Sequence, residues 1–382
     1  MQTFDFEPID LPPHVPAFRA EVRDFLAAEM GDVSAVKKAH SWSYFDAEFS
    51  RKMAKRGWIG MTWPKQYGGR ERSAIERYVL LEELLAAGAP VGAHWIADRQ
   101  SGPTLMRYGT EAQRRCFLPA IANGELFFCI GMSEPNTGSD LASVRTRGVE
   151  TSEGWRINGQ KIWTTHAHQA HMMIALVRTG SEEQKRHEGL SQFVIDLKTP
   201  GITIRPIIDL VGDVHFNEVF FDNVLVPHDS LIGNAGDGWK QCTSELSLER
   251  SGPERYLSSI QLFFELLRVV GPNPPESIKE AIGRITAEMW TLRQMSLSVA
   301  GQLAAGKDPA VEAAIVKDLG NGFEQELPRL VQAVCDAEID LGGDQPFAQV
   351  LAFLIQASPS FSLRGGTREI LRGIIARGLG LR

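Results

Sequence analysis

Hydroxyl, glycine and aromatic residues gather in two short stretches of the sequence. Residues 131–140 read GMSEPNTGSD and residues 158–165 read NGQKIWTT. Small hydroxyl residues beside Gly and Pro let the backbone and an Oγ approach the edge of a planar heterocycle closely. Ser133 and Thr165 are such residues, and Trp163 offers an aromatic surface to cover a ring. Taken alone, each stretch is more readily a turn and Trp163 a core aromatic, but together they favour a cofactor site.

A third stretch, near the C-terminus, is also rich in glycine. Residues 363–370 read LRGGTREI, and residues 374–377 read IIAR. Glycines allow backbone N–H groups to reach a diphosphate, and a helix beginning near Thr367 would add a favourable dipole. A Gly-Gly pair by itself is weak evidence, because it usually ends a helix.

Composition limits the class of protein. The chain has 382 residues, enough for two or three domains with ample core. Hydrophobic residues make up 43% and charged residues 23%, which argues against disordered, collagen-like and coiled-coil proteins. The 40 Lys and Arg against 47 Asp and Glu leave a net charge of −7, and this sign argues against binding of duplex nucleic acid.

The cysteines and the N-terminus predict a cytoplasmic protein. The four cysteines stand far apart, which fits free thiols in a reducing compartment. Residues 1–15 are acidic and Pro-rich and show no secretory signal. No stretch approaches the roughly 18 apolar residues of a membrane-spanning helix, so no membrane association is expected.

Several other chemistries lack their motifs. No GxSxG sequence supports a serine hydrolase, and no GxGxxG sequence opens a nicotinamide-binding βα unit. The run HAHQAH at residues 166–171 has no Cys or carboxylate cluster beside it and is interpreted as a turn rather than a metal site. No metal is therefore expected.

The hydrophobic period changes twice along the chain. It is helical over residues 16–122, becomes typical of strands from about residue 125, and is helical again beyond residue 238. The predicted fold is α+β: an N-terminal helical domain, a middle antiparallel β-barrel or sandwich, and a C-terminal domain like a four-helix bundle. The predicted boundaries are 1–122, 123–232 and 233–382.

Strands and breaks are predicted within these domains. Residues 158–159, 200–201 and 222–223 are predicted to be turns, and helix breaks are predicted at residues 271–275, 306 and 342–343. The predicted strands are residues 155–157, 161–165, 172–178, 191–197, 202–206 and 217–221.

Taken together, the motifs resemble the acyl-CoA dehydrogenase family of flavoenzymes. The resemblance covers essentially the whole chain: WPKQYGG at residues 63–69, EPxxGSD at 134–140, NGxKxWxT at 158–165 and GGTxEI at 365–370 occur in the family's order. It implies the family's fold, an FAD cofactor and dehydrogenation of an acyl-CoA thioester between its α- and β-carbons. It also implies an electron-transfer flavoprotein as acceptor and an assembly of four chains.

The resemblance also assigns residues to the cofactor. Met132 and Ser133 would contact the isoalloxazine, Trp163 and Thr165 would wrap its other side, and Ser139 would lie by the cofactor or the thioester. The remaining FAD contacts, partly across a subunit interface, would come from Gly342, Gly343, Gly366, Thr367 and Glu369.

Desaturation of an acyl-CoA requires a base. A carboxylate must take the α-proton while hydride leaves the β-carbon for flavin N5, and donors at the thioester oxygen must stabilise the developing enolate. In much of the family the carboxylate immediately precedes the Gly-Thr of the terminal motif, but Gly365 stands there in this chain.

A second family pattern places the base just before an arginine on the first long C-terminal helix. By this pattern Glu249 is the predicted base, Arg250 a neighbouring positioning residue at the substrate, and the Gly365 N–H a donor to the thioester oxygen. Branches with this arrangement handle branched, long-chain or bulky polycyclic acyl groups, including steroids. Without the resemblance, a Glu-Arg pair on a helix is more often part of an exposed face.

A further departure concerns assembly. The family's Arg-x-x-Phe-Gly element, which reaches the partner subunit's FAD, is absent from residues 267–274. Steroid-degrading relatives form heterotetramers with fewer flavins than subunits, so both homo- and heterotetramers are considered. Two alternative functions stay open: a non-catalytic or half-site subunit of such a heteromer, and an acyl-CoA oxidase or specialised thioester desaturase.

Overall fold

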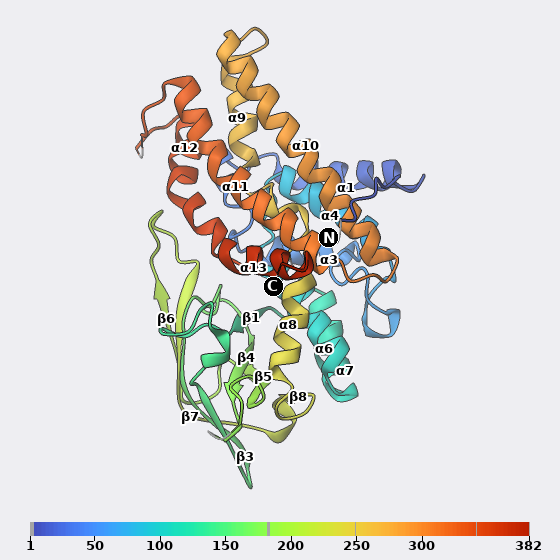
Figure 1. Ribbon diagram of the computed structural model, residues 1–382, viewed down its shortest axis with the longest axis vertical. Coiled ribbons are helices and arrows are strands. Elements are labelled where there is room, and N and C mark those ends of the chain that lie inside the picture. The colour runs from blue at the N-terminus through green and yellow to red at the C-terminus, as the bar shows by residue number, and fades with distance from the viewer. Residues whose placement is uncertain (1–3, 182–183, 249, 341, 382) are drawn as a thin grey trace. The chain divides into compact units, whose positions relative to one another are not determined.

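The computed structural model describes residues 4–181, 184–248, 250–340 and 342–381. The chain forms two compact units (Figure 1). Unit 1 comprises Met1–Tyr44, Arg72–Val91 and Ser247–Arg382, and unit 2 comprises Phe45–Glu71 and Gly92–Leu246. Helices of the N-terminal region therefore belong to both units. The division into three domains at residues 122 and 232 stays a prediction.

Unit 1 is helical. Within it, α10 packs against α11 and α4, α12 packs against α9 and α2, and α13 packs against α11. A buried cluster at the contact of α10 and α11 contains Val299, Ala313 and Val316. The α-helices are α1 (Val15–Met30), α2 (Ala35–Ala39), α4 (Ala74–Ala86), α9 (Ile260–Val270), α10 (Glu276–Ala304), α11 (Ala310–Cys335), α12 (Pro346–Ala357) and α13 (Arg368–Gly378).

Two buried glutamates tie three helices of unit 1 together. Glu82 on α4 accepts hydrogen bonds from Arg293 on α10 at 2.6 and 3.2 Å and from Arg19 on α1 at 2.9 Å. Its neighbour Glu83 accepts from Arg19 and, at 2.7 Å, from Arg23. Because the carboxylates are buried and doubly paired, these contacts fix the positions of α1 and α10 on α4.

Unit 2 combines short helices with one sheet of eight strands. Its helices are α3 (Ala47–Lys55), α5 (Gly92–Ile96), α6 (Gly102–Tyr108), α7 (Glu111–Ala122) and most of α8 (Gly238–Leu248). The strands are β1 (Phe128–Gly131), β2 (Arg147–Thr151), β3 (Gly154–Lys161), β4 (Met172–Arg178), β5 (Leu190–Asp196), β6 (Ile202–Ile207), β7 (Phe216–Val226) and β8 (Leu231–Ile232). Their order is β6-β7-β3-β2-β4-β5-β8, with β1 beside β4.

Most strand pairs are antiparallel, as predicted for the middle region. The pairs β2–β3, β3–β7, β4–β5, β5–β8 and β6–β7 are antiparallel, whereas β1–β4 and β2–β4 are parallel. The core under the sheet is apolar and includes Ile157, Phe193 and Val219, none of which is exposed. The sheet is therefore mixed rather than purely antiparallel.

Two local predictions in β3 and β7 are wrong. Residues 158–159 and 222–223, predicted as turns, lie opposite each other on paired strands, where the register shifts between Ile157 and Gly159. The Asn223 N–H donates to Asn158 Oδ1 at 2.7 Å, which stabilises this irregularity. Gly159 and Asn223, with φ values of 146° and 52°, thus form part of a β-bulge instead of reversing the chain.

The predicted strand at residues 161–165 is also wrong, because β3 ends at Lys161. Trp163 has a φ of 59°, which no extended strand accommodates. In the helical regions the predicted breaks are confirmed: residues 271–275, 306 and 342–343 separate α9, α10, α11 and α12. Across the described residues, no helix combines the length and apolarity that crossing a membrane requires.

Candidate active site

The predicted site residues fall into two groups, one in each compact unit. Glu249, the predicted base, lies outside the described residues. Unit 2 contains Met132, Ser133, Ser139, Trp163 and Thr165, and unit 1 contains Arg250, Gly342, Gly343, Gly365, Gly366, Thr367 and Glu369.

In unit 2, the stretch after β1 forms a tight reversal. Glu134 and Thr137 exchange backbone N–H···O bonds, both of 2.9 Å. The Ile162 N–H donates to the Ser133 carbonyl at 3.0 Å. This bond brings the first motif against the second, so the structure places Ser133 close in space to the segment that carries Trp163.

A fully buried lysine holds this reversal in place. Lys161 ends β3 with no exposed surface, and its Nζ lies 2.9 Å from Glu134 Oε1 and 3.1 Å from the Met132 carbonyl oxygen. The other bonds of the Glu134 carboxylate come from the N–H groups of Arg145 at 2.7 Å and Thr146 at 2.8 Å. Lys161 and Glu134 therefore fix the backbone of Met132 and Ser133.

The electrostatics of this pair follow from its burial. Burial lowers the pKa of Lys161 to about 8, although Glu134 works against the shift. Burial opposes ionisation of Glu134, but Lys161 and the surrounding donors outweigh it and hold the pKa of that carboxyl below its usual value. Sequence analysis assigned no role to these two residues. The available signal was that Lys161 lies an even number of residues after Trp155 and Ile157, in the alternation typical of a strand with one face in the core.

Trp163 presents an aromatic surface on an anchored backbone. Its side chain is 56% exposed, and its ring packs edge-on against Phe216 with centroids 5.9 Å apart. The next residue is fixed on both sides, because the Thr164 N–H donates to the Asn217 carbonyl and Asn217 Nδ2 donates to the Thr164 carbonyl. An exposed indole in this setting fits the cover of a planar ring. Thr165 beside it is half-buried.

Ser139 lies on an exposed part of the same motif. Nearby, Arg186 lies 3.1 Å from Asp140 Oδ2 and donates to Ser143 Oγ at 2.8 Å. The histidines at residues 166–171 form a turn, as predicted. Within the described ranges, no three His, Cys, Asp or Glu side chains are grouped so as to hold a metal ion.

In unit 1, the terminal glycine loop (residues 365–367) leads into α13. Gly365 and Gly366 have φ values of 65° and 99°, which favour glycine strongly. Thr367 is the N-cap residue and α13 begins at Arg368, so the predicted helix start is confirmed. A Cβ placed on Gly366 would lie 3.9 Å from a guanidinium nitrogen of Arg250. The structure thus brings Arg250, which is buried, beside the loop.

Buried charged side chains hold the terminal glycine loop and the residue before it. Lys317 Nζ on α11 donates to the Gly366 carbonyl at 3.1 Å. Arg364 donates to Glu324 Oε2 at 3.1 Å and to Ser258 Oγ at 2.6 Å, and its guanidinium lies over the Trp42 ring at 4.7 Å. Lys317 and Glu324 have no exposed surface. Sequence analysis missed Lys317, although it lies four residues after buried Ala313 on the apolar stripe of α11.

The titration of Lys317 gives a testable pH dependence. Burial lowers its pKa to about 6, and Arg255, Arg364 and Arg250 lower it further, against Glu324. In the unfolded chain the amine keeps a pKa near 10.5. Between these two values the unfolded chain binds the extra proton, so the stability of the wild type relative to K317M should rise with pH. Urea unfolding at pH 6.5, 7.5 and 8.5 measures this, and a difference that falls with pH would contradict it.

Acidic side chains lie at the positions predicted to contact the diphosphate. The Gly342 N–H donates to Asp340 Oδ1 at 3.0 Å, and the Gly343 N–H donates to the Asp340 carbonyl at 3.5 Å. At the start of α13, bonds from its own N–H and from Thr367 lower the pKa of Glu369, so its carboxylate is ionised. These groups fit an anionic diphosphate poorly, whereas the residues of unit 2 fit the flavin ring.

Comparison with known proteins identifies the family. The model of the acyl-CoA dehydrogenase N-terminal domain matches residues 13–125, and that of the acyl-CoA dehydrogenase middle domain matches residues 129–224. Together they cover more than half of the chain. The chain belongs to the acyl-CoA dehydrogenase family.

Individual relatives extend this match along the chain. The acyl-CoA dehydrogenase IpdE1 of Mycobacterium tuberculosis is 35% identical, over 96% of this chain and 98% of its own length. A solved structure described as the Tcur3481-Tcur3483 steroid ACAD is 28% identical with a TM-score of 0.88, covering 98% of this chain and 99% of its own. The ChsE4-ChsE5 complex from Mycobacterium tuberculosis is 29% identical with a TM-score of 0.84, covering 98% of this chain and all of its own.

These matches confirm the predicted family, fold and enzyme class. This acyl-CoA dehydrogenase has the family's helical N-terminal region, sheet-containing middle region and helical C-terminal region. As a member of the family it is an FAD-dependent oxidoreductase that dehydrogenates acyl-CoA thioesters. The roles of individual site residues stay predictions.

Proposed function

We propose that this acyl-CoA dehydrogenase uses Glu249 as the base that removes the α-proton of its substrate. The observation that supports this assignment is the position of Arg250, the residue after Glu249, beside Gly366 in the terminal glycine loop. The family commonly takes its base from that loop, where this chain has Gly365. A carboxylate next to Arg250 replaces the one that the loop lacks.

The remaining residues position the reactants and stabilise charge. The Gly365 N–H donates to the thioester oxygen and stabilises the negative charge that develops as the α-proton leaves. Arg250 is a neighbouring positioning residue at the substrate. Met132, Ser133, Trp163 and Thr165 bind and cover the isoalloxazine, and Ser139 lies at its edge or at the thioester. The bound FAD supplies the hydride acceptor.

A thioester panel tests this function. The purified protein is mixed without oxygen with CoA thioesters from short branched to steroid-sized, and the flavin absorbance is followed. We expect bleaching by at least one thioester and an α,β-unsaturated product. Turnover with oxygen alone would favour an oxidase, and turnover that requires an electron-transfer flavoprotein would favour a dehydrogenase. A protein that holds FAD but is bleached by no thioester would contradict the proposal.

A bulky acyl group and a heteromeric assembly form a second part of the proposal. Two similar solved structures are described as a steroid ACAD and as a complex of two proteins. In this chain, Asp340 accepts from the Gly342 N–H, where the resemblance places a diphosphate contact. A carboxylate at this position disfavours an anionic ligand, so we propose that a different subunit supplies part of the FAD site in a cytoplasmic heterotetramer.

The assembly is tested by flavin counting. The chain is purified alone and together with candidate partner chains, and the ratio of FAD to protein is measured with the molar mass of the assembly. We expect fewer flavins than chains in a four-chain complex, and less FAD on the chain alone. Full FAD occupancy of a homotetramer would contradict the heteromeric arrangement.

Removing the indole of Trp163 should weaken FAD retention. Because the side chain is 56% exposed, we expect Trp163→Ala to shift the unfolding temperature of the FAD-free protein by only a few degrees. Loss of the stacking surface should raise the FAD dissociation constant about tenfold. Fluorescence titration with FAD measures this constant. Trp290→Ala, which removes an indole 60% exposed on α10, is the matched control, and equal FAD affinity in both variants would refute the role of Trp163.

A further inference from the structure

Lys317 makes a contact that the assigned roles do not explain. It lies on α11 with no exposed surface, and its described partner is the Gly366 carbonyl, 3.1 Å from Nζ. Among the described residues, no carboxylate lies within ion-pair distance of this amine. The nearby charged groups that act on it are instead mostly arginines: Arg255, Arg364 and Arg250.

A lysine in this position is costly. Burial and the three arginines lower its pKa to about 6, so the amine is mostly uncharged near neutral pH. A methionine would fill the same space without a desolvation cost, and replacing buried charged groups by apolar ones of similar volume is often stabilising. Packing therefore does not account for the lysine, whereas the bond to Gly366 does, since a neutral amine still donates N–H.

The loop that receives this bond needs external support. Gly365 and Gly366 both have positive φ, and consecutive glycines allow many backbone conformations. The Gly366 carbonyl and the Thr367 N–H belong to one peptide group, which directly precedes α13. A bond to that carbonyl fixes the orientation of this peptide group and so limits the freedom of Gly365 before it.

The part of α11 that carries Lys317 is itself held in place. At Gly320, one turn along α11, a Cβ would lie 2.0 Å from the Arg255 carbonyl oxygen, so the helix packs directly on that backbone. The buried Glu324 accepts from the Ser258 N–H at 2.8 Å and anchors the same helix one turn further. Lys317 therefore extends from a fixed helix to a flexible loop.

We propose that Lys317 is a positioning residue that holds the terminal glycine loop in the conformation needed for the reaction. The inference rests on the proposed function, in which the Gly365 N–H donates to the thioester oxygen. Displacement of a positioned group by about 1 Å can cost about a hundredfold in rate. Lys317 thus acts on the rate through the loop, without contact with the substrate.

Two substitutions at Lys317 separate positioning from simple packing. K317M keeps the volume and removes the donor, whereas K317Q keeps an N–H donor on a shorter side chain. The matched control is K279M, at an exposed lysine on α10. For each variant we would measure FAD content, the dissociation constant of an acyl-CoA, the rate of anaerobic flavin reduction and hydrogen–deuterium exchange over residues 360–372.

We expect K317M to retain FAD and to bind the thioester within about threefold of the wild type. Its flavin reduction should be 10- to 100-fold slower, and the amides of the terminal glycine loop should exchange faster. K317Q should recover part of both effects, and K279M should match the wild type. A K317M protein with unchanged rate and unchanged exchange would overturn the proposal, as would equal losses in K317M and K317Q.

The exchange measurement needs no substrate, and this separates two failures. If the wild type is bleached by no thioester, the proposed function fails, while faster exchange in K317M would still support the positioning role. If the wild type reacts and K317M equals it in rate and exchange, only the inference about Lys317 fails.

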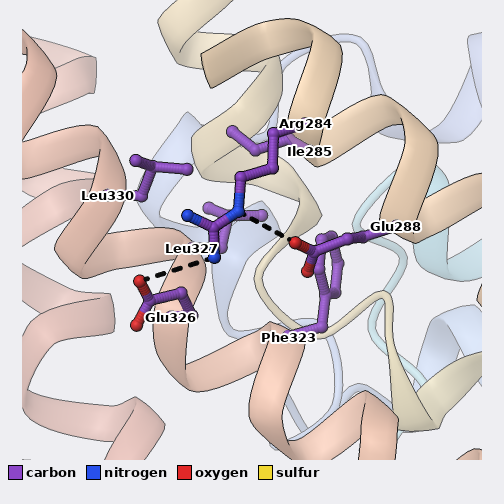
Figure 2. A pocket seen from close by; sticks show the side chains of 7 residues that line it. All are labelled: Arg284, Ile285, Glu288, Phe323, Glu326, Leu327 and Leu330. Atoms are coloured by element: carbon purple, nitrogen blue, oxygen red, sulfur yellow. Dashed lines mark hydrogen bonds and ion pairs between the residues drawn. The ribbon is translucent and has the colours of Figure 1, made fainter. Parts of the chain in front are cut away.

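A small hollow between α10 and α11 carries no comparable inference. It is lined by Arg284, Glu288 and Glu326 with apolar neighbours, and Arg284 donates to Glu288 Oε1 at 3.0 Å. Figure 2 shows the same arginine turned toward Glu326. The charged groups of this hollow already pair with one another, so it offers no unsatisfied group to a ligand.

Discussion

Glu249→Gln should slow the reduction of bound flavin by an acyl-CoA at least a hundredfold while leaving the protein yellow. Glutamine has nearly the shape of glutamate but cannot accept the α-proton, and a positioned general base contributes about 10²- to 10⁴-fold. Stopped-flow absorbance without oxygen measures the reduction rate, and the flavin spectrum of the resting protein measures FAD content. The expected combination is full colour with almost no bleaching.

The control for this variant is Glu276→Gln, which changes an exposed carboxylate at the start of α10. It should reduce its flavin at the wild-type rate. A Glu249→Gln protein that bleaches within a few-fold of the wild type would assign the proton transfer to another group. Loss of FAD in this variant would instead indicate a structural role for Glu249.

Lys161→Met should destabilise the protein by about 3 kcal/mol, the low end for removal of one partner from a buried ion pair. The low end applies because Glu134 keeps its bonds from the N–H groups of Arg145 and Thr146. The variant should also retain less FAD, since the Met132 carbonyl loses the ammonium that fixes it. Urea unfolding of the FAD-free protein measures the stability, and absorbance measures the FAD content.

A double variant isolates the pair itself. When Lys161→Met is combined with Glu134→Gln, no uncompensated charge remains. The double variant should therefore be more stable than the sum of the two single losses predicts. The matched control is Lys185→Met, which removes an exposed lysine of unit 2 that pairs with Glu188 and should change stability by less than about 1 kcal/mol. Strict additivity of the two single variants would show that Lys161 and Glu134 act independently.

Sequence predicted those parts of the fold that local pattern determines. The strand at residues 172–178 is β4 with the predicted bounds, because its residues before Arg178 are apolar and it is buried along most of its length. The start of α13 after Thr367 follows from the two glycines that precede it, which end one segment before Thr367 takes the N-cap position of the next. Helix breaks at Gly and Pro were equally local and were confirmed.

The two wrong turn predictions share one cause, which is pairing between distant segments. Residues 158–159 have the sequence of a hairpin turn. However, they pair with β7, and the register shift at this point makes a bulge within the two strands. The same limit applies to the site. Lys161 contacts Glu134 across 27 residues and Lys317 contacts Gly366 across 49, so no spacing within one element could show either contact.

The roles of the site residues came from family motifs, and geometry adds to them unevenly. Trp163 and Ser133 are supported by an exposed ring and by a backbone bond between the two motifs. Gly342 and Glu369 are less well supported, because carboxylates lie where a diphosphate was expected. That difference depends on side-chain contacts outside the motifs, which the motifs do not encode.

Segments of unit 1 lie both before and after unit 2 in the sequence, and this sets an order for folding during synthesis. Every segment of unit 2 has been translated once Leu246 is made, so this unit can close while the rest of the chain is still being added. The early helices α4 and α2 pack on α10 and α12 of the last segment, so their apolar faces stay uncovered until that segment is made. Between these events, the uncovered apolar faces favour aggregation of the nascent chain.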